Sequence, residues 1–290
     1  MNKRELLKVL ESEGITSVKK RLGQNFIIDK NLTKFITDKL LVKNENKNNL
    51  ILEIGPGLGA LTDNLIKSKD TNNIVSIEYD NKFFNFLKKK YSNFNNIKFI
   101  NNDILDVDIS KIVENCNYVV ISSLPYYLAT PIISKLLNYE KLPETMVLLV
   151  QEEIANRLIS KPNCKDYGKI SVKLQLLFSI KKIKKIPPDV FYPKPLIQSS
   201  IIICNKKNNI SISEKEKNTL GNLLNILFSN RRKKITTSIK KFLDANTSAN
   251  INKNYESILN LCNIEQNFRP ENITPEKYLK LVKSINNSYV

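Results

Sequence analysis

One decapeptide organises the rest of the sequence: Leu50-Ile51-Leu52-Glu53-Ile54-Gly55-Pro56-Gly57-Leu58-Gly59. Its first five residues form a short apolar run, typical of a buried strand, and three glycines follow at alternate positions. Glycines directly after a strand let the backbone approach a ligand closely. The decapeptide therefore predicts a strand that ends in a nucleotide-type loop, with a plain tight turn as the alternative.

The glycine spacing excludes two common nucleotide sites. The order here is G-x-G-x-G, whereas a dinucleotide-binding loop reads G-x-G-x-x-G. No Walker lysine follows, so the loop is not a P-loop. An NAD-dependent oxidoreductase fails on this spacing, and no candidate proton donor lies beside Tyr126.

Strand-like and helix-like patterns alternate along the first part of the chain. Helical spacing occurs at 58–67 and 83–91, and short apolar runs occur at 50–54, 74–78, 97–100, 118–121 and 146–150. This rhythm is typical of an α/β fold with a doubly wound, mainly parallel sheet. Such sheets bind ligands at the carboxyl ends of their strands.

The pattern changes near residue 205. A proline-rich passage, 186–195, predicts a rigid loop, and a strand at 199–204 precedes a polar linker at 205–209. From Ser213 the pattern is all helical, opening with a capping box and closing with a helix at 275–284. We therefore expect a domain over 1–205 and a small helical domain over 206–290.

Two acidic residues follow the next strands in order. Glu78 ends the second strand, where a carboxylate can accept from ribose hydroxyls, and Asp103 follows the third, where it can accept from an adenine amino group. Taken alone, Glu78 would also be typical of a solvated strand end, and Asp103 would also be typical of a turn. The ordered set of glycine loop, acid and acid indicates an adenosine-containing ligand without requiring a pyrophosphate.

The strand at 118–121 leads into Ser123-Leu124-Pro125-Tyr126. Methyltransferases that act on amines place a tetrapeptide of the form Asp/Asn/Ser-Pro/Leu-Pro-Tyr at this point. Its first side chain and a backbone carbonyl hold the N–H groups of a poorly nucleophilic exocyclic amine, and the tyrosine stacks on an unstacked base. A Pro-Tyr turn without function is the alternative.

Composition limits the remaining chemistry. The 290 residues include no histidine and four separated cysteines, which argues against a metal site, a histidine general base and disulfides. The formal net charge of +18 favours nucleic acid as a partner, although solvated lysines or a membrane surface would also explain it. No signal peptide or apolar run of membrane-spanning length is seen, so we expect a cytoplasmic protein.

The chain resembles the KsgA family, the small-subunit (16S) rRNA adenine N6,N6-dimethyltransferases. Beyond the glycine loop and the tetrapeptide, the resembling segments are Lys20-Arg21-Leu22-Gly23-Gln24-Asn25-Phe26, Gln151-Glu152-Glu153-Ile154-Ala155-Asn156-Arg157-Leu158, Asp166-Tyr167-Gly168, Val190-Phe191-Tyr192-Pro193-Lys194-Pro195, Phe228-Ser229-Asn230-Arg231-Arg232-Lys233-Lys234 and Arg269-Pro270-Glu271. They occur in order over nearly the whole chain. The segments at 166–168 and 228–234 favour this family over the related large-subunit enzymes that confer macrolide resistance.

The resemblance implies a Rossmann-like methyltransferase domain that binds S-adenosyl-L-methionine, followed by a helical rRNA-binding domain. Cofactor contacts are implied for Asn25, Ile27, Gly55, Gly57, Glu78, Asp103 and Ser123. A target-base pocket is implied for Ser123, the Leu124 carbonyl, Pro125, Tyr126 and Phe191, and RNA contacts for Lys20, Arg21, Arg231, Arg232 and Lys233. The implied substrate is a pair of adjacent adenines near the 3′ end of small-subunit rRNA in a 30S precursor, and the implied state is a monomer.

One position departs from the family pattern. The family has asparagine where this chain has Ser123, whose hydroxyl is shorter and a weaker acceptor than an amide. Loss of an oriented acceptor is expected to slow the reaction on the order of 10²-fold, by analogy with an oxyanion-hole donor. The sequence therefore leaves open a working but slowed enzyme and a ribosome-assembly factor that has lost its chemistry.

Overall fold

The computed structural model describes residues 2–15, 25–42, 49–68, 73–114, 116–246 and 255–287. The chain forms two compact units, Met1–Ala155 with Ser179–Lys206, and Asn156–Phe178 with Lys207–Val290. The segment Asn156–Phe178, which the sequence places within 1–205, belongs to the second unit. Its Tyr167 hydroxyl, for example, donates to the Ile273 carbonyl at 2.9 Å.

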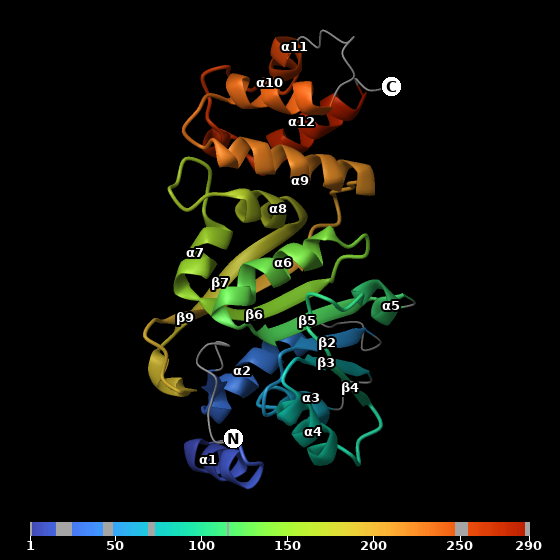
Figure 1. The fold of residues 1–290 in the computed structure, drawn as a ribbon, viewed down its shortest axis with the longest axis vertical. Helices are drawn as coiled ribbons and strands as arrows, with labels where there is room; N and C mark the ends of the chain where they lie inside the picture. Colours follow the sequence, from blue (N-terminus) through green and yellow to red (C-terminus); the bar gives the residue numbers. More distant parts are fainter. Residues whose placement is uncertain are drawn as a thin grey trace. The chain divides into compact units, whose positions relative to one another are not determined.

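A seven-stranded sheet forms the centre of the first unit (Figure 1). In spatial order its strands are β4 (Ile97–Asn101), β3 (Ile74–Glu78), β2 (Leu50–Ile54), β5 (Tyr118–Ser123), β6 (Thr145–Gln151), β9 (Ser199–Lys206) and β7 (Phe178–Ile186). The first five strands pair in parallel, and β9 is antiparallel to β6. The expected α/β fold with a mainly parallel sheet is confirmed.

Helices connect the successive parallel strands: α3 (Thr62–Lys67), α4 (Asn81–Lys90), α5 (Ile109–Val113), and η2 (Tyr126–Leu128) with α6 (Ala129–Asn138). Helices α1 (Lys3–Ser12) and α2 (Lys30–Leu41) precede β2, and α7 (Glu152–Ile159) follows β6. Every residue of β2 and β3 is buried, as expected for strands covered on both faces. Ile36 and Leu40 of α2 belong to the same buried cluster as Ile51 and Val119. Among the described residues, no helix is long and apolar enough to cross a membrane.

Several predicted elements differ in extent. The helix expected at 58–67 begins only at Thr62, because the chain first turns through Gly59, whose φ is +81°. The proline-rich passage expected as a loop contains η3 (Pro188–Val190) and β8 (Phe191–Tyr192), which pairs with β1 (Phe26–Ile27). Strand β7 was not predicted, since its Ile-Lys-Lys repeat lacks the two-residue alternation of apolar and polar residues that is typical of a strand. Strand β9 continues to Lys206, inside the expected linker.

The second unit is helical over its described residues from Ser213 onward, as predicted. Its elements are α8 (Lys169–Leu177), α9 (Glu214–Ser229), α10 (Ile235–Asn246), α11 (Tyr255–Leu261), η4 (Pro270–Asn272) and α12 (Pro275–Asn287). The expected capping box at Ser213 is present, and the last helix runs three residues beyond Ser284. Phe228 packs between Tyr167 and Tyr278, with ring centroids 6.4 Å apart in each pair.

Strand β2 carries one buried acid, Glu53, which is 1% exposed. The Thr62 hydroxyl donates to its carboxylate at 2.8 Å, and the Ser76 hydroxyl also donates. Burial raises the pKa of Glu53 to about 7, while the hydroxyls of Ser76 and Thr62 partly oppose the shift. The folded protein therefore holds a proton here that an unfolded chain releases near pH 4.5.

This proton makes stability depend on pH. Between about pH 4.5 and 7 the unfolded state binds fewer protons than the folded state, so the free energy of unfolding should fall as pH rises. Glu53→Gln should remove this contribution, so between pH 5 and pH 8 the wild type should lose roughly 3 kcal/mol more stability than the variant does. Urea unfolding of both proteins at pH 5 and pH 8 measures the difference; parallel pH profiles would contradict it.

Candidate active site

A pocket of about 270 Å³ opens at the carboxyl ends of β2, β3 and β5. All of its lining residues belong to the first unit. It brings together the glycine loop after β2, the acids after β3 and β4, the tetrapeptide after β5, and the short β1–β8 ribbon. Segments separated by more than 160 residues thus meet at one edge of the sheet.

The glycine loop adopts backbone angles that favour glycine. Gly55 and Gly57 have φ values of +65° and +59°, and a Cβ on Gly57 would lie 3.3 Å from the Phe26 ring. The Gly55 amide donates to the Ile77 carbonyl at 2.9 Å, which fixes the loop against β3. The loop therefore presents backbone, without side chains at these two positions, toward a ligand.

Glu78 is 6% exposed and lines the pocket at the end of β3. One carboxylate oxygen accepts from the Gly57 amide at 2.9 Å, and the other accepts from the Asp80 amide at 2.8 Å. Burial raises the pKa of Glu78, and the two amides act in the opposite direction. A carboxylate has about four acceptor positions, so its oxygens can still accept from a pair of ribose hydroxyls.

Asp103 lines the pocket within a turn that is fixed by its own backbone. Its carbonyl accepts from the amides of Asp106 and Val107, and its Oδ1 accepts from the Leu105 amide at 2.8 Å. Burial, followed by the charge of Asp103, raises the pKa of Tyr127, and both residues line the same pocket. Asp103 and Tyr127 together form a polar and aromatic wall suited to an adenine.

The tetrapeptide forms the wall next to β5. Ser123 is half-buried, the Leu124 amide donates to the Leu149 carbonyl at 3.0 Å, and η2 begins after Pro125. The Tyr126 hydroxyl lies 2.9 Å from the Ser199 hydroxyl, which fixes the direction of the ring. The backbone path therefore holds the serine and the tyrosine in the same pocket.

The β1–β8 ribbon supplies the remaining expected residues. Ile27 pairs with Phe191 and Phe26 pairs with Tyr192, so the N-terminal segment lies beside the proline-rich passage. Asn25, Ile27 and Phe191 all line the pocket. Every residue that the sequence predicts for the cofactor or the target base therefore lines it.

The residues expected to bind RNA do not share one environment. Lys20 and Arg21 lie outside the described residues. Arg231, in the second unit, forms an ion pair with Glu271, and its Nη2 donates to the Cys164 carbonyl at 3.0 Å. Arg232 and Lys233 are exposed. The structure thus gives Arg231 a structural role within its unit and leaves its two neighbours at the surface.

The lining residues that sequence reasoning did not assign to the site include Leu6, Tyr79, Tyr127 and Ser199. Tyr79 and Tyr127 directly follow Glu78 and Tyr126, so adjacency to a predicted site residue was the available signal. Ser199 opens β9 and could have been found only through its contact with Tyr126. Leu6 reaches the pocket because α1 packs its apolar side, through Leu6 and Leu10, into the cluster around Phe26.

Comparisons with known proteins place this geometry in a family. Residues 15–286 match the family model "Ribosomal RNA adenine dimethylase". The chain is 35% identical over 271 residues to the ribosomal RNA small subunit methyltransferase A of Ehrlichia canis, covering 92% of this chain and 97% of that protein. It is 33% identical to the protein of the same name from Ureaplasma parvum, covering 99% and 100%.

Solved structures share the fold. A dimethyladenosine transferase from Plasmodium falciparum superposes with a TM-score of 0.70 at 22% identity, covering 88% of this chain and 97% of that one. The 23S rRNA methyltransferase ErmE gives 0.64 at 20% identity, covering 90% and 99%. The match of the family model over most of the chain, together with these relatives, shows that the chain belongs to the ribosomal RNA adenine dimethylase family.

Proposed function

We propose that this chain uses S-adenosyl-L-methionine to dimethylate the N6 amines of two adjacent adenines near the 3′ end of small-subunit rRNA. One observation carries the proposal: a single pocket holds two acidic acceptors after β3 and β4 and an amine-binding tetrapeptide after β5. The first feature suits an adenosine-containing methyl donor, and the second suits an amine on a base. Relatives that are named for small-subunit rRNA methylation cover 90% or more of the chain.

The pocket residues fit the methyl donor. Glu78 would hold the ribose, Asp103 the adenine amine, and Asn25 with Ile27 the methionine part, while Gly55 and Gly57 allow the backbone to lie against it. S-adenosyl-L-methionine supplies an electrophilic methyl group on a sulfonium centre. A positively charged centre is compatible with this pocket, since two acidic side chains, Glu78 and Asp103, line it.

The tetrapeptide prepares the acceptor amine. The lone pair of an exocyclic amine is delocalised into its ring, so the amine is a weak nucleophile until its N–H groups are held out of that plane. The Ser123 hydroxyl and the Leu124 carbonyl are the acceptors placed for this task. Orientation and fixed dipoles supply the rate, and the chain needs no histidine base for that contribution.

Two aromatic rings receive the target base. Tyr126 and Phe191 line the pocket from different elements, η2 and β8. An adenine reaches such a pocket only after it leaves its stack in the RNA, and stacking on aromatic faces offsets part of that cost. The Tyr126–Ser199 contact keeps one of these faces in place before RNA binds.

Binding of the rRNA involves charge outside the pocket. We assign this role to Arg232 and Lys233 at the surface of the helical unit, and to Lys20 and Arg21 in the N-terminal segment. The net charge of +18 supports contacts with many phosphates, whose affinity falls with salt. The substrate form we propose is a precursor of the 30S subunit, modified in the cytoplasm by a monomer with a catalytic domain and an rRNA-binding domain.

The first test measures methyl transfer from labelled S-adenosyl-L-methionine to small subunits that lack these methyl groups. The wild type should dimethylate adenine, and Asp103→Ala should raise the KM for the methyl donor about tenfold or more by removing a charged acceptor. Ser123→Asn should raise kcat, on the order of 10²-fold if the serine hydroxyl is as poor an acceptor as its length suggests.

The opposite result is equally informative. If the wild type binds the subunits but transfers no methyl group at saturating donor, the chain is an assembly factor and the proposed reaction is wrong. If Ser123→Asn leaves kcat unchanged, the serine already supplies the acceptor and the proposed weakness at this position is wrong.

A second test separates structural from RNA-binding arginines. Arg231→Met should lower the stability of the helical unit by about 1–3 kcal/mol, because Glu271 and the Cys164 carbonyl lose a charged donor. The double variant Arg232→Met/Lys233→Met should keep its Tm but bind RNA more weakly, with a shallower dependence on salt. Thermal unfolding and RNA titrations at two or more salt concentrations measure both effects. Weaker RNA binding by Arg231→Met at unchanged Tm would contradict the structural role.

A further inference from the structure

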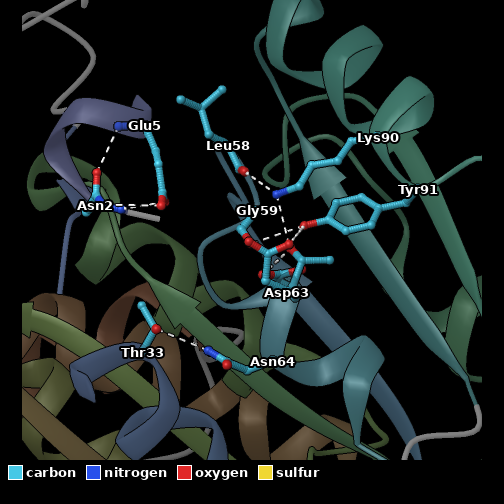
Figure 2. Close-up of polar contacts among 11 residues, drawn as sticks. Asn2, Glu5, Thr33, Leu58, Gly59, Asp63, Asn64, Lys90 and Tyr91 are labelled. Atoms are coloured by element: carbon cyan, nitrogen blue, oxygen red, sulfur yellow. Dashed lines mark hydrogen bonds and ion pairs between the residues drawn. The ribbon is translucent and has the colours of Figure 1, made fainter. Parts of the chain in front are cut away.

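The glycine loop has a second side, opposite the pocket. Residues 55–58 line the pocket, whereas Gly59, Asp63, Lys90 and Tyr91 do not. Figure 2 shows Lys90 and Tyr91, at the end of α4, reaching toward Leu58, Gly59 and Asp63. The loop therefore lies between its ligand pocket and the carboxyl end of α4.

Tyr91 fills the space behind Gly59. Its hydroxyl donates to Asp63 Oδ1 at 2.8 Å and lies 3.2 Å from the Gly59 carbonyl, so one proton serves two acceptors. A Cβ on Gly59 would lie 2.3 Å from this hydroxyl oxygen, and the φ of +81° already disfavours any other residue. Burial, and then the charge of Asp63, raises the pKa of Tyr91, so the hydroxyl remains a donor at physiological pH.

Lys90 contacts Leu58, the residue before Gly59. Its ammonium group lies 2.8 Å from Asp63 Oδ1 and donates to the Leu58 carbonyl at 3.3 Å. Asp63, in the first turn of α3, thus contacts the side chains of both Lys90 and Tyr91. Its own amide donates to the Gly59 carbonyl at 2.9 Å. The side chains of Lys90 and Asp63 are only 24% and 31% exposed, so solvent weakens this pair less than a surface pair.

We propose that Tyr91, with Lys90 and Asp63, is a positioning group that sets the glycine loop in its methyl-donor-binding conformation. Strand β3 and helix α4 would then hold the loop from its two sides. Glu78, at the end of β3, accepts from the Gly57 amide inside the pocket, and Tyr91, directly after α4, holds Gly59 from behind. Removing the rear contact lets the loop relax, so the donor must reorder it on binding and affinity falls.

The proposal rests on the proposed function, because it assumes that the ligand is S-adenosyl-L-methionine. Tyr91→Phe keeps the ring and removes only the hydroxyl. Tyr118→Phe is the matched control. Tyr118 is also buried, its hydroxyl donates to the Lys141 carbonyl at 3.1 Å, and it does not line the pocket. Lys90→Met is a second variant, at a partly exposed residue, and it removes the ion pair between Lys90 and Asp63.

The experiment combines calorimetric titration of S-adenosylhomocysteine with methyl-transfer kinetics on unmethylated small subunits. Tyr91→Phe should raise the Kd, and the KM for the methyl donor, about tenfold, with kcat at saturating donor and the KM for RNA within about twofold of wild type. Lys90→Met should shift the same two constants in the same direction. Tyr118→Phe should lower Tm without changing the Kd.

Amide hydrogen exchange gives an independent readout. Residues 57–61 should exchange faster in Tyr91→Phe than in Tyr118→Phe, and the ligand should reduce this difference. If Tyr91→Phe and Lys90→Met bind the ligand as tightly as Tyr118→Phe does, the positioning role is wrong even though the wild type methylates RNA. If the wild type itself binds no ligand and transfers no methyl group, the proposed function fails instead.

Discussion

The turn from β2 into α3 is the constraint on which the site depends. Between Ile54 and Thr62 the chain must leave a buried strand, expose backbone to a ligand and enter a helix, and positive φ at three glycines makes this path possible. Contacts from β3 and α4 then fix the path, through Glu78 within the pocket and Tyr91 behind it. A flexible sequence becomes a rigid surface because neighbouring elements hold it from both sides.

Much of the sheet could be predicted, because buried parallel strands are continuous apolar runs that glycines and acids interrupt at one end only. The same rule located Glu78, Asp103 and Ser123, since the carboxyl ends of parallel strands meet at one edge. Elements without such a signal were missed. Strand β7 repeats one isoleucine followed by two lysines, and β8 lies among prolines, so local composition pointed away from strands in both cases.

Contacts between distant residues account for the other gaps. Tyr91 lies 32 residues from Gly59, and Ser199 lies 73 residues from Tyr126; in neither pair does one residue signal the other in the sequence. Arg231 shows the opposite case, in which the sequence suggested a role that the contacts of the side chain do not match. A basic cluster in a basic chain suggested phosphate binding, yet the guanidinium is engaged by Glu271 and a carbonyl, which only the folded unit reveals. A strand can be recognised from the periodicity of its own residues, but the partner of a side chain cannot be recognised from that side chain alone.

In the reaction that we propose, the site works through fixed acceptors and does not depend on titrating bases. Burial raises the pKa of both Glu53 and Glu78, but their surroundings differ: hydroxyls donate to Glu53, whereas two backbone amides donate to Glu78. Backbone amides cannot rotate away or accept in return, so they favour the charged form of Glu78 and oppose the effect of burial, which suits the role of ribose acceptor that we propose for it. Glu53, deeper and held by hydroxyls that can also accept, tolerates a proton. The difference between the two acids therefore follows from the type of donor that each strand end provides.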